Sequence, residues 1–165
     1  MNKWLKPLLI LAVMLGGCAA DWQTKRLAEA RLKGNAPVTV IEGFLDLGFT
    51  ENHGLVFGVL NHKLQEAGRA VLVGVRIVLT LGLTVVIWRN RSRSLLFLSA
   101  LALVWAGAAG NSIDPFVYGY VVDFIHIHLG RVLDWPFYFN VADAWVTVGV
   151  AGLLVSYPAA ETKTA

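Results

Sequence analysis

Four apolar segments constrain the fold of this chain more than any other feature of its sequence. A stretch of about 20 mainly apolar residues is long enough to cross a hydrocarbon core roughly 30 Å thick. Segments that approach this length run over approximately residues 4–20, 70–88, 95–110 and 141–157. Charged residues make up only 15% of the chain, whereas soluble domains carry roughly a quarter. The sequence therefore predicts an all-α membrane protein with four transmembrane helices, forming a single domain over residues 1–165.

The basic residues lie at the edges of the apolar segments. They occur before the first segment, between the second and third, and after the fourth: Lys3, Lys6, Arg89, Arg91, Arg93 and Lys163. Because cytoplasmic loops carry the excess of Lys and Arg, we expect both ends of the sequence to face the cytoplasm, and residues 21–69 and 111–140 to form external loops. The net charge of +3 then reflects membrane topology, and no basic face for nucleic acid is expected.

The first external loop contains two patterns of regular structure. Residues 24–33 have an amphipathic helical pattern that ends at Gly34 and Pro37, both of which commonly follow a helix. Residues 37–50 intersperse apolar and polar side chains in the manner of β-strands. We therefore expect a short amphipathic helix at the membrane interface, followed by a small external β-rich cradle.

The single cysteine excludes an internal disulfide and permits two interpretations. Leu15, Gly16 and Gly17 precede Cys18 after a basic start and an apolar run, which is typical of a lipoprotein signal that ends in a lipid-accepting cysteine. Alternatively, Cys18 packs within the first transmembrane helix, where small neighbours permit close helix contact. The three further spans favour packing, because a lipoprotein would be released as a soluble or tethered domain.

Two aspartates at the outer ends of apolar segments are candidates for chemistry. An ionised carboxylate is costly in the apolar run around Asp123, so the default hypothesis there is a functional group with a raised pKa. Asp143 follows Asn140 by three residues, the spacing of a helix-capping box, and Asp114 follows Asn111 in the same way. Spacing alone therefore favours capping for Asp143. Two carboxylates that share one proton can nevertheless perform acid–base hydrolysis.

Histidines offer a less favoured alternative. His126 and His128 alternate with isoleucines, and on a strand both imidazoles would lie on one side. Together with His53 or His62 they could begin a metal site. No phosphate-binding loop or dinucleotide fingerprint is present.

Two further polar residues permit competing interpretations. A Ser–Lys nucleophile pair would need Ser112, the one serine in the expected external loops, to lie near Lys25. Arg76 lies six residues into the second span. Its side chain could snorkel to the interface or pair with a carboxylate inside the bundle.

Five ordered blocks resemble a known family over about residues 8–149. They are Asp21-Trp22-Gln23-Thr24-Lys25, Asn52-His53-Gly54-Leu55-Val56-Phe57, Gly110-Asn111-Ser112-Ile113-Asp114, Tyr118-Gly119-Tyr120-Val121-Val122-Asp123-Phe124 and Phe139-Asn140-Val141-Ala142-Asp143. In this order, and within a frame of four spans, the blocks resemble those of the lipoprotein signal peptidases, also called signal peptidase II.

The resemblance implies a membrane aspartyl endopeptidase with Asp123 and Asp143 as its catalytic pair. Such an enzyme removes the signal peptide from diacylglyceryl-modified bacterial prolipoproteins by cleaving on the amino side of the lipidated cysteine. The residues expected to bind substrate or support the pair are Asp21, Lys25, Asn52, Gly54, Asn111, Asp114 and Asn140. No metal or organic cofactor is expected. We expect a monomer in the inner membrane, in contact with lipid, with its active site near the periplasmic face.

One departure from the family pattern leaves alternatives open. An arginine normally follows the Gly-Asn-x-x-Asp block, but here Pro115 follows Asp114. Arg76 or Arg131 could supply the missing cation. The alternatives to a peptidase are a catalytically impaired paralogue that binds lipopeptides, a non-enzymatic membrane adaptor, and an ion or proton pathway that uses Asp123 and Arg76.

Overall fold

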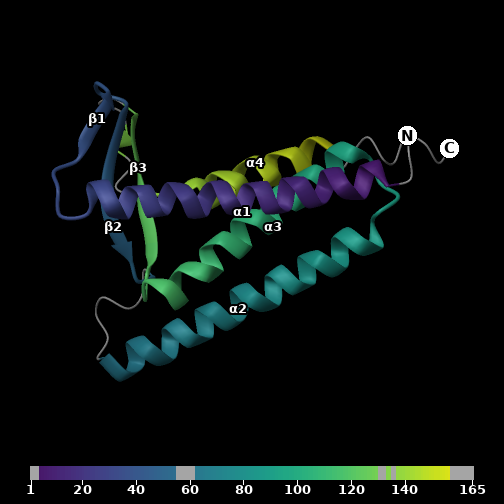
Figure 1. The fold of residues 1–165 in the computed structure, drawn as a ribbon, viewed down its shortest axis with the longest axis horizontal. Helices are drawn as coiled ribbons and strands as arrows, with labels where there is room; N and C mark the ends of the chain where they lie inside the picture. The colour runs from purple at the N-terminus through teal and green to yellow at the C-terminus, as the bar shows by residue number, and fades with distance from the viewer. Residues whose placement is uncertain (1–3, 55–61, 130–132, 135–136, 157–165) are drawn as a thin grey trace.

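The computed structural model describes residues 4–54, 62–129, 133–134 and 137–156. Within these residues, helices extend from a small β-sheet at one end of the molecule (Figure 1). The helices are α1 (Leu5–Leu32), α2 (His62–Arg89), α3 (Leu95–Val117) and α4 (Val141–Ser156). The strands are β1 (Val38–Ile41), β2 (Leu45–Asn52), β3 (Val121–Leu129) and β4 (Leu133–Asp134).

The helices are those of a membrane-type protein. In the described part of the chain, three helical stretches are long and apolar enough to cross a bilayer, namely residues 5–32, 70–89 and 95–117. The described part of α4 is also apolar but has only 16 residues. Large apolar side chains on the outer faces of the helices are exposed, for example Leu15, Val78 and Leu154. Because soluble proteins rarely expose so much contiguous apolar surface, these faces are suited to lipid.

The central helix is α3, which packs against each of the other three helices. Small residues permit these close approaches. A Cβ atom at Gly107 would overlap the carbonyl oxygen of Ala142 in α4, and one at Gly149 would lie 2.7 Å from the carbonyl oxygen of Ala100. The start of α4 is therefore held directly against the second half of α3.

Cys18 lies inside α1 at the contact with α3. Its thiol is 3.6 Å from the carbonyl oxygen of Ala106, and a Cβ atom on the neighbouring Gly17 would lie 2.7 Å from the Ala106 Cβ. The structure thus places Cys18 in a tight helix contact, in agreement with the packing interpretation.

Two helices extend beyond the spans expected from sequence. The prediction of a separate interfacial helix over residues 24–33 is wrong, because α1 continues without interruption to Leu32. Asp21 and Lys25 lie one helical turn apart and form a buried ion pair, so this turn packs inside the protein. In the same way α3 continues to Val117. Asn111 and Asp114 are therefore helical, whereas the third span was expected to end at about residue 110.

The sheet covers the end of the helices at which α1 and α3 finish (Figure 1). Its strand order is β1-β2-β3-β4 and neighbouring strands are antiparallel, which confirms the strand character expected for residues 37–50. The last turns of α1 pack on the sheet through Ala28 and Leu32, which contact Val122 and Phe124 of β3. These apolar contacts hold β3 against the C-terminal end of α1.

The β2–β3 pairing brings polar residues together. Thr50 pairs with Asp123, and Asn52 pairs with Val121. The end of β2 therefore lies beside the start of β3, which follows α3 directly.

The glycine contact between α3 and α4 gives a testable prediction. The change Gly107→Ala should force the two helices apart and lower the free energy of unfolding by about 1–3 kcal/mol. The matched control is Gly16→Ala, because a Cβ atom at Gly16 meets nothing within 4 Å. Thermal unfolding in detergent, followed by tryptophan fluorescence, measures both variants. Equal melting temperatures for the two variants would contradict the packing described here.

Candidate active site

A buried ammonium group lies at the centre of the polar core. Lys25 is fully buried, and its Nζ lies 2.8 Å from Asp21 Oδ2, 2.7 Å from Asp114 Oδ2 and 2.9 Å from Asn111 Oδ1. These three oxygen neighbours match the three N–H groups of an ammonium. Both aspartates are also fully buried. Because a buried charge is costly unless it is paired and hydrogen-bonded, the three charged side chains stabilise one another.

The two aspartates around Lys25 also bind backbone groups of the neighbouring elements. Asp21 Oδ1 accepts a hydrogen bond from the backbone N–H of Ala142 at 2.8 Å, in the first turn of α4. Asp114 Oδ2 accepts one from the backbone N–H of Val122 at 3.2 Å, in β3. The residues that follow these two N–H groups are Asp143 and Asp123. The Lys25 cluster therefore fixes the two backbone segments that carry the candidate catalytic pair.

The candidate pair is organised around Asn140. Asp123 Oδ1 accepts a hydrogen bond from Asn140 Nδ2 at 2.7 Å, and Asp123 Oδ2 accepts one from Asn52 Nδ2 at 2.8 Å. Asp143 Oδ2 accepts from the Asn140 backbone N–H at 3.0 Å, and Asp143 Oδ1 accepts from Asn111 Nδ2 at 2.8 Å. Asn140 is fully buried and Asp123 is 3% exposed. Both carboxylates thus contact the same residue from different elements of the fold.

The capping interpretation of Asp143 and its place beside Asp123 are compatible. The backbone N–H of Asp143 donates to Asn140 Oδ1 at 3.0 Å, while Asp143 Oδ2 accepts from the backbone N–H of Asn140. These reciprocal bonds form a capping box. One oxygen of Asp143 takes part in the cap and the other accepts from Asn111. The cap therefore holds the orientation of the carboxylate.

Gly54 orients Asn52. The backbone N–H of Gly54 donates to Asn52 Oδ1 at 2.8 Å, which leaves Nδ2 directed at Asp123. Gly54 has a φ of 89°, a value that glycine adopts readily and other residues rarely do. Asn52 is exposed, whereas Asp123 and Asn140 are buried. The site therefore reaches the protein surface at Asn52.

Burial changes the proton affinity of Asp123. Loss of solvent and the nearby charge of Asp143 raise the pKa of Asp123 to about 6, although hydrogen bonds from Asn52 and Asn140 and the charge of Lys25 oppose the rise. The largest of these effects is burial. Asp123 consequently keeps its proton to a higher pH than an exposed aspartate, whose pKa is about 4.

Arg76 supplies a hydrogen bond that Pro115 cannot make. In an α-helix the N–H of residue 115 would donate to the carbonyl of Asn111, but proline has no N–H. Arg76 Nη1, from α2, donates to that carbonyl at 2.9 Å instead. Arg76 therefore supports the backbone of Asn111, whose side chain bonds Asp143. Arg131, the other candidate for the missing cation, lies outside the described residues.

The other chemistries considered from sequence are not assembled at this site. Ser112 Oγ donates to the carbonyl oxygen of Ala108 at 2.6 Å, and Lys25 is occupied by its three oxygen neighbours, so the Ser–Lys pair does not form. His126 and His128 lie close to Asp46, not to His53. The side chain of His62 lies outside the described part of the chain.

All nine residues expected at the site are brought into one hydrogen-bonded network. They are Asp21, Lys25, Asn52, Gly54, Asn111, Asp114, Asp123, Asn140 and Asp143. Their functional roles remain predictions. What the arrangement can do chemically is hold two carboxylates near each other, one of them with a raised pKa, at the edge of a buried polar core.

Comparison with known proteins shows the family to which the chain belongs. The family model described as signal peptidase (SPase) II matches residues 12–158. The chain belongs to the signal peptidase II family. This is a family of aspartic peptidases, and the match includes Asp123, Asp143 and the Lys25 cluster.

Relatives and solved structures cover most of the chain. The lipoprotein signal peptidase of Methylobacterium sp. (strain 4-46) is 39% identical over 155 residues, which is 92% of this chain and 90% of that protein. That of Chlorobium phaeobacteroides (strain DSM 266) is 31% identical over 160 residues, or 93% and 89% of the two chains. A solved structure of a bacterial membrane enzyme is 26% identical with a TM-score of 0.70, and covers 95% of this chain and 94% of that one. The signal peptidase II fold therefore extends over nearly the full length.

The buried cluster gives a second prediction. Lys25→Met leaves two buried carboxylates without their cation and should lower the free energy of unfolding by about 3–5 kcal/mol. Adding Asp21→Asn and Asp114→Asn to Lys25→Met removes the uncompensated charge, so this triple variant should be more stable than Lys25→Met alone. Thermal unfolding in detergent measures the series. A triple variant less stable than the single one would show that charge pairing is not what holds the cluster.

Proposed function

We propose that this chain is a membrane aspartyl endopeptidase that removes the signal peptide from diacylglyceryl-modified bacterial prolipoproteins. Cleavage occurs on the amino side of the lipidated cysteine. The observation that carries the proposal is the pair of carboxylates, Asp123 and Asp143, that contact Asn140 from β3 and α4. The relatives named lipoprotein signal peptidase support the substrate class.

The proposed mechanism is acid–base hydrolysis with one water molecule. Asp143 is the ionised partner and removes a proton from the water, whose oxygen attacks the scissile carbonyl carbon. Asp123 is the protonated partner, in line with its raised pKa, and donates its proton to the carbonyl oxygen. Collapse of the tetrahedral intermediate re-forms the carbonyl and breaks the C–N bond. The proton held by Asp143 passes to the leaving nitrogen, and a hydroxyl proton of the intermediate returns to Asp123. The asparagines act by holding the two carboxylates in place.

We place the protein in the bacterial inner membrane with four spans and both ends of the sequence on the cytoplasmic side. The connection between α2 and α3 contains Arg91 and Arg93, and it lies at the opposite end of the helices from the sheet (Figure 1). By the positive-inside rule the sheet and the site then face the periplasm. All of the network residues come from one chain, so a monomer in contact with lipid and substrate is sufficient. No nucleic acid, metal or organic cofactor is needed for the reaction.

Cleavage of a prolipoprotein tests the proposal directly. Purified wild-type protein in detergent should cleave a diacylglyceryl-modified prolipoprotein, detected as a gel shift. Asp123→Asn and Asp143→Asn should each reduce the rate by at least about a hundredfold, because each removes an acid or base. The matched control is Glu42→Gln, an exposed carboxylate in the turn between β1 and β2, which should retain the wild-type rate.

Two negative results of this cleavage experiment would have different meanings. An inactive wild type, under conditions in which a control peptidase cleaves the substrate, would indicate a catalytically impaired paralogue that binds lipopeptides. Unchanged cleavage by both aspartate variants would contradict the catalytic pair and leave Asp143 with a capping role alone.

The pKa of Asp123 predicts the pH dependence of cleavage. As the pH rises through about 6, Asp123 loses the proton that the mechanism requires, so kcat/KM should fall on the alkaline side. The hydrogen bond from Asn52 stabilises the charged form and lowers this pKa. Asn52→Ala should therefore shift the alkaline limb to higher pH, in addition to reducing the rate. Asn35→Ala is the control, because Asn35 bonds the carbonyl of Arg31 outside the site. A limb that stays in place in Asn52→Ala would contradict the assignment.

Arg76 donates to the Asn111 carbonyl in place of the N–H that Pro115 lacks. This substitution of donors predicts that a second change can restore the activity lost when Arg76 is removed. Arg76→Ala removes the donor to the Asn111 carbonyl and should reduce cleavage roughly tenfold, since one hydrogen bond contributes about 0.5–1.5 kcal/mol. Pro115→Ala supplies the missing N–H to the same carbonyl. The double variant should therefore recover most of the lost activity. A double variant no more active than Arg76→Ala would show that Arg76 acts through another contact.

A further inference from the structure

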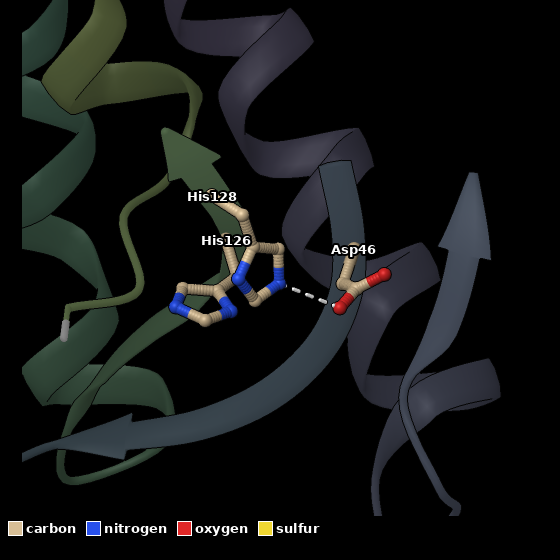
Figure 2. A group of neighbouring side chains, drawn as sticks. All are labelled: Asp46, His126 and His128. Carbon is tan, nitrogen blue, oxygen red and sulfur yellow. Dashed lines mark hydrogen bonds and ion pairs between the residues drawn. The ribbon is translucent and has the colours of Figure 1, made fainter. Parts of the chain in front are cut away.

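We propose that Asp46, His126 and His128 form a binding site for a divalent transition metal, best suited to Zn²⁺, on the sheet and separate from the catalytic pair. Figure 2 shows the three side chains gathered between β2 and β3, with the His128 ring directed at the Asp46 carboxylate. No residue of this group takes part in the network around Lys25. The proposal does not rest on the peptidase function.

The sheet brings the three ligands together. His126 and His128 are two residues apart on β3, so both side chains lie on the same face. Asp46 of β2 is the register partner of His126 across the strand pair, and directly opposed residues have close Cβ atoms. One ligand atom from each residue lies within 4.8 Å of the other two. His128 Nε2 lies 2.7 Å from Asp46 Oδ2.

The donor set matches the coordination chemistry of zinc. Two imidazole nitrogens and one carboxylate oxygen bind Zn²⁺ at about 2.0–2.2 Å, and three protein ligands leave one position of the tetrahedron for water or another ligand. The side chains of His128 and Asp46 are 27% and 23% exposed. An ion can therefore enter the site, and modest rotations of the side chains would bring the three donor atoms around it.

Neighbouring groups hold two of the ligands in position. The Tyr138 ring stacks on His126 with ring centroids 4.7 Å apart and an interplanar angle of 17°. The Thr39 side chain of β1 hydrogen-bonds the Asp46 carboxylate. Such contacts outside the metal's own ligands commonly orient metal-binding side chains. Here one such contact is made to His126 on β3 and another to Asp46 on β2.

Zinc titration of the purified full-length protein tests the proposal. The protein is prepared in detergent without a histidine tag, and Zn²⁺ binding is measured by isothermal calorimetry at neutral pH. We expect saturable binding of one Zn²⁺ per chain, lost in His126→Ala and in Asp46→Asn. The matched control is His53→Ala, an exposed histidine that contacts Glu51 and Tyr120 and should bind zinc as the wild type does.

Thermal unfolding separates loss of the site from loss of the fold. Saturating Zn²⁺ should raise the melting temperature of the wild type and of His53→Ala, because a ligand that binds only the folded state stabilises it. It should leave the melting temperature of a folded His126→Ala unchanged. Absence of saturable binding in the wild type would overturn the proposal. Equal binding by wild type and His126→Ala, or loss of binding in His53→Ala, would also overturn it.

Discussion

The buried ammonium group of Lys25 is the interaction on which the rest of the structure depends. It has no access to water, so its charge is stabilised only by the oxygen atoms that the fold supplies. Asp21 and Asp114 neutralise it and at the same time bind the backbone N–H groups of Ala142 and Val122. One charged cluster thereby joins α1 and α3 to α4 and β3. Because breaking a buried ion pair is strongly destabilising, the positions of the segments that carry Asp123 and Asp143 are coupled to the stability of the bundle.

The network extends from this cluster to the candidate catalytic pair, Asp123 and Asp143, through asparagine side chains. Asn111 accepts from Lys25 and donates to Asp143, and Asn140 donates to Asp123 and to Asn111. An amide can donate and accept at once, so it transmits orientation without adding charge to the core. Burial and the charge of Asp143 raise the pKa of Asp123, and the hydrogen bonds from Asn52 and Asn140 limit that rise. The capping box of α4 likewise holds an orientation, since it fixes Asp143 through backbone atoms.

Much of the fold was predictable from sequence, because burial in lipid demands long apolar segments. The strand character of residues 37–50 and the candidate aspartates were also evident. The continuation of α1 beyond Asp21 was not predictable, because charged residues at the end of an apolar segment usually indicate the membrane interface. Only the ion pair with Asp114, which is distant in sequence, explains why Lys25 is buried. The hydrogen bonds from the backbone N–H groups of Ala142 and Val122 to the two aspartates could not be predicted either, because every residue except proline has such a group.

Contacts between distant segments were also out of reach of the sequence. The donor that replaces the N–H missing at Pro115 comes from Arg76, about 40 residues earlier, and this contact requires the packing of α2 on α3. For the same reason Asp46 could not be paired with His126 before the strand register was known.

The most direct test of this account is the protonation state of Asp123. Infrared difference spectroscopy of the purified protein, recorded below and above pH 6, detects the carbonyl stretch of a protonated carboxyl group. The account predicts a wild-type band that disappears as the pH rises through the Asp123 pKa of about 6, and that is absent from the spectrum of Asp123→Asn. A wild-type spectrum identical to that of Asp123→Asn would show that Asp123 does not hold the proton, and would contradict the proposed division of roles between the two aspartates.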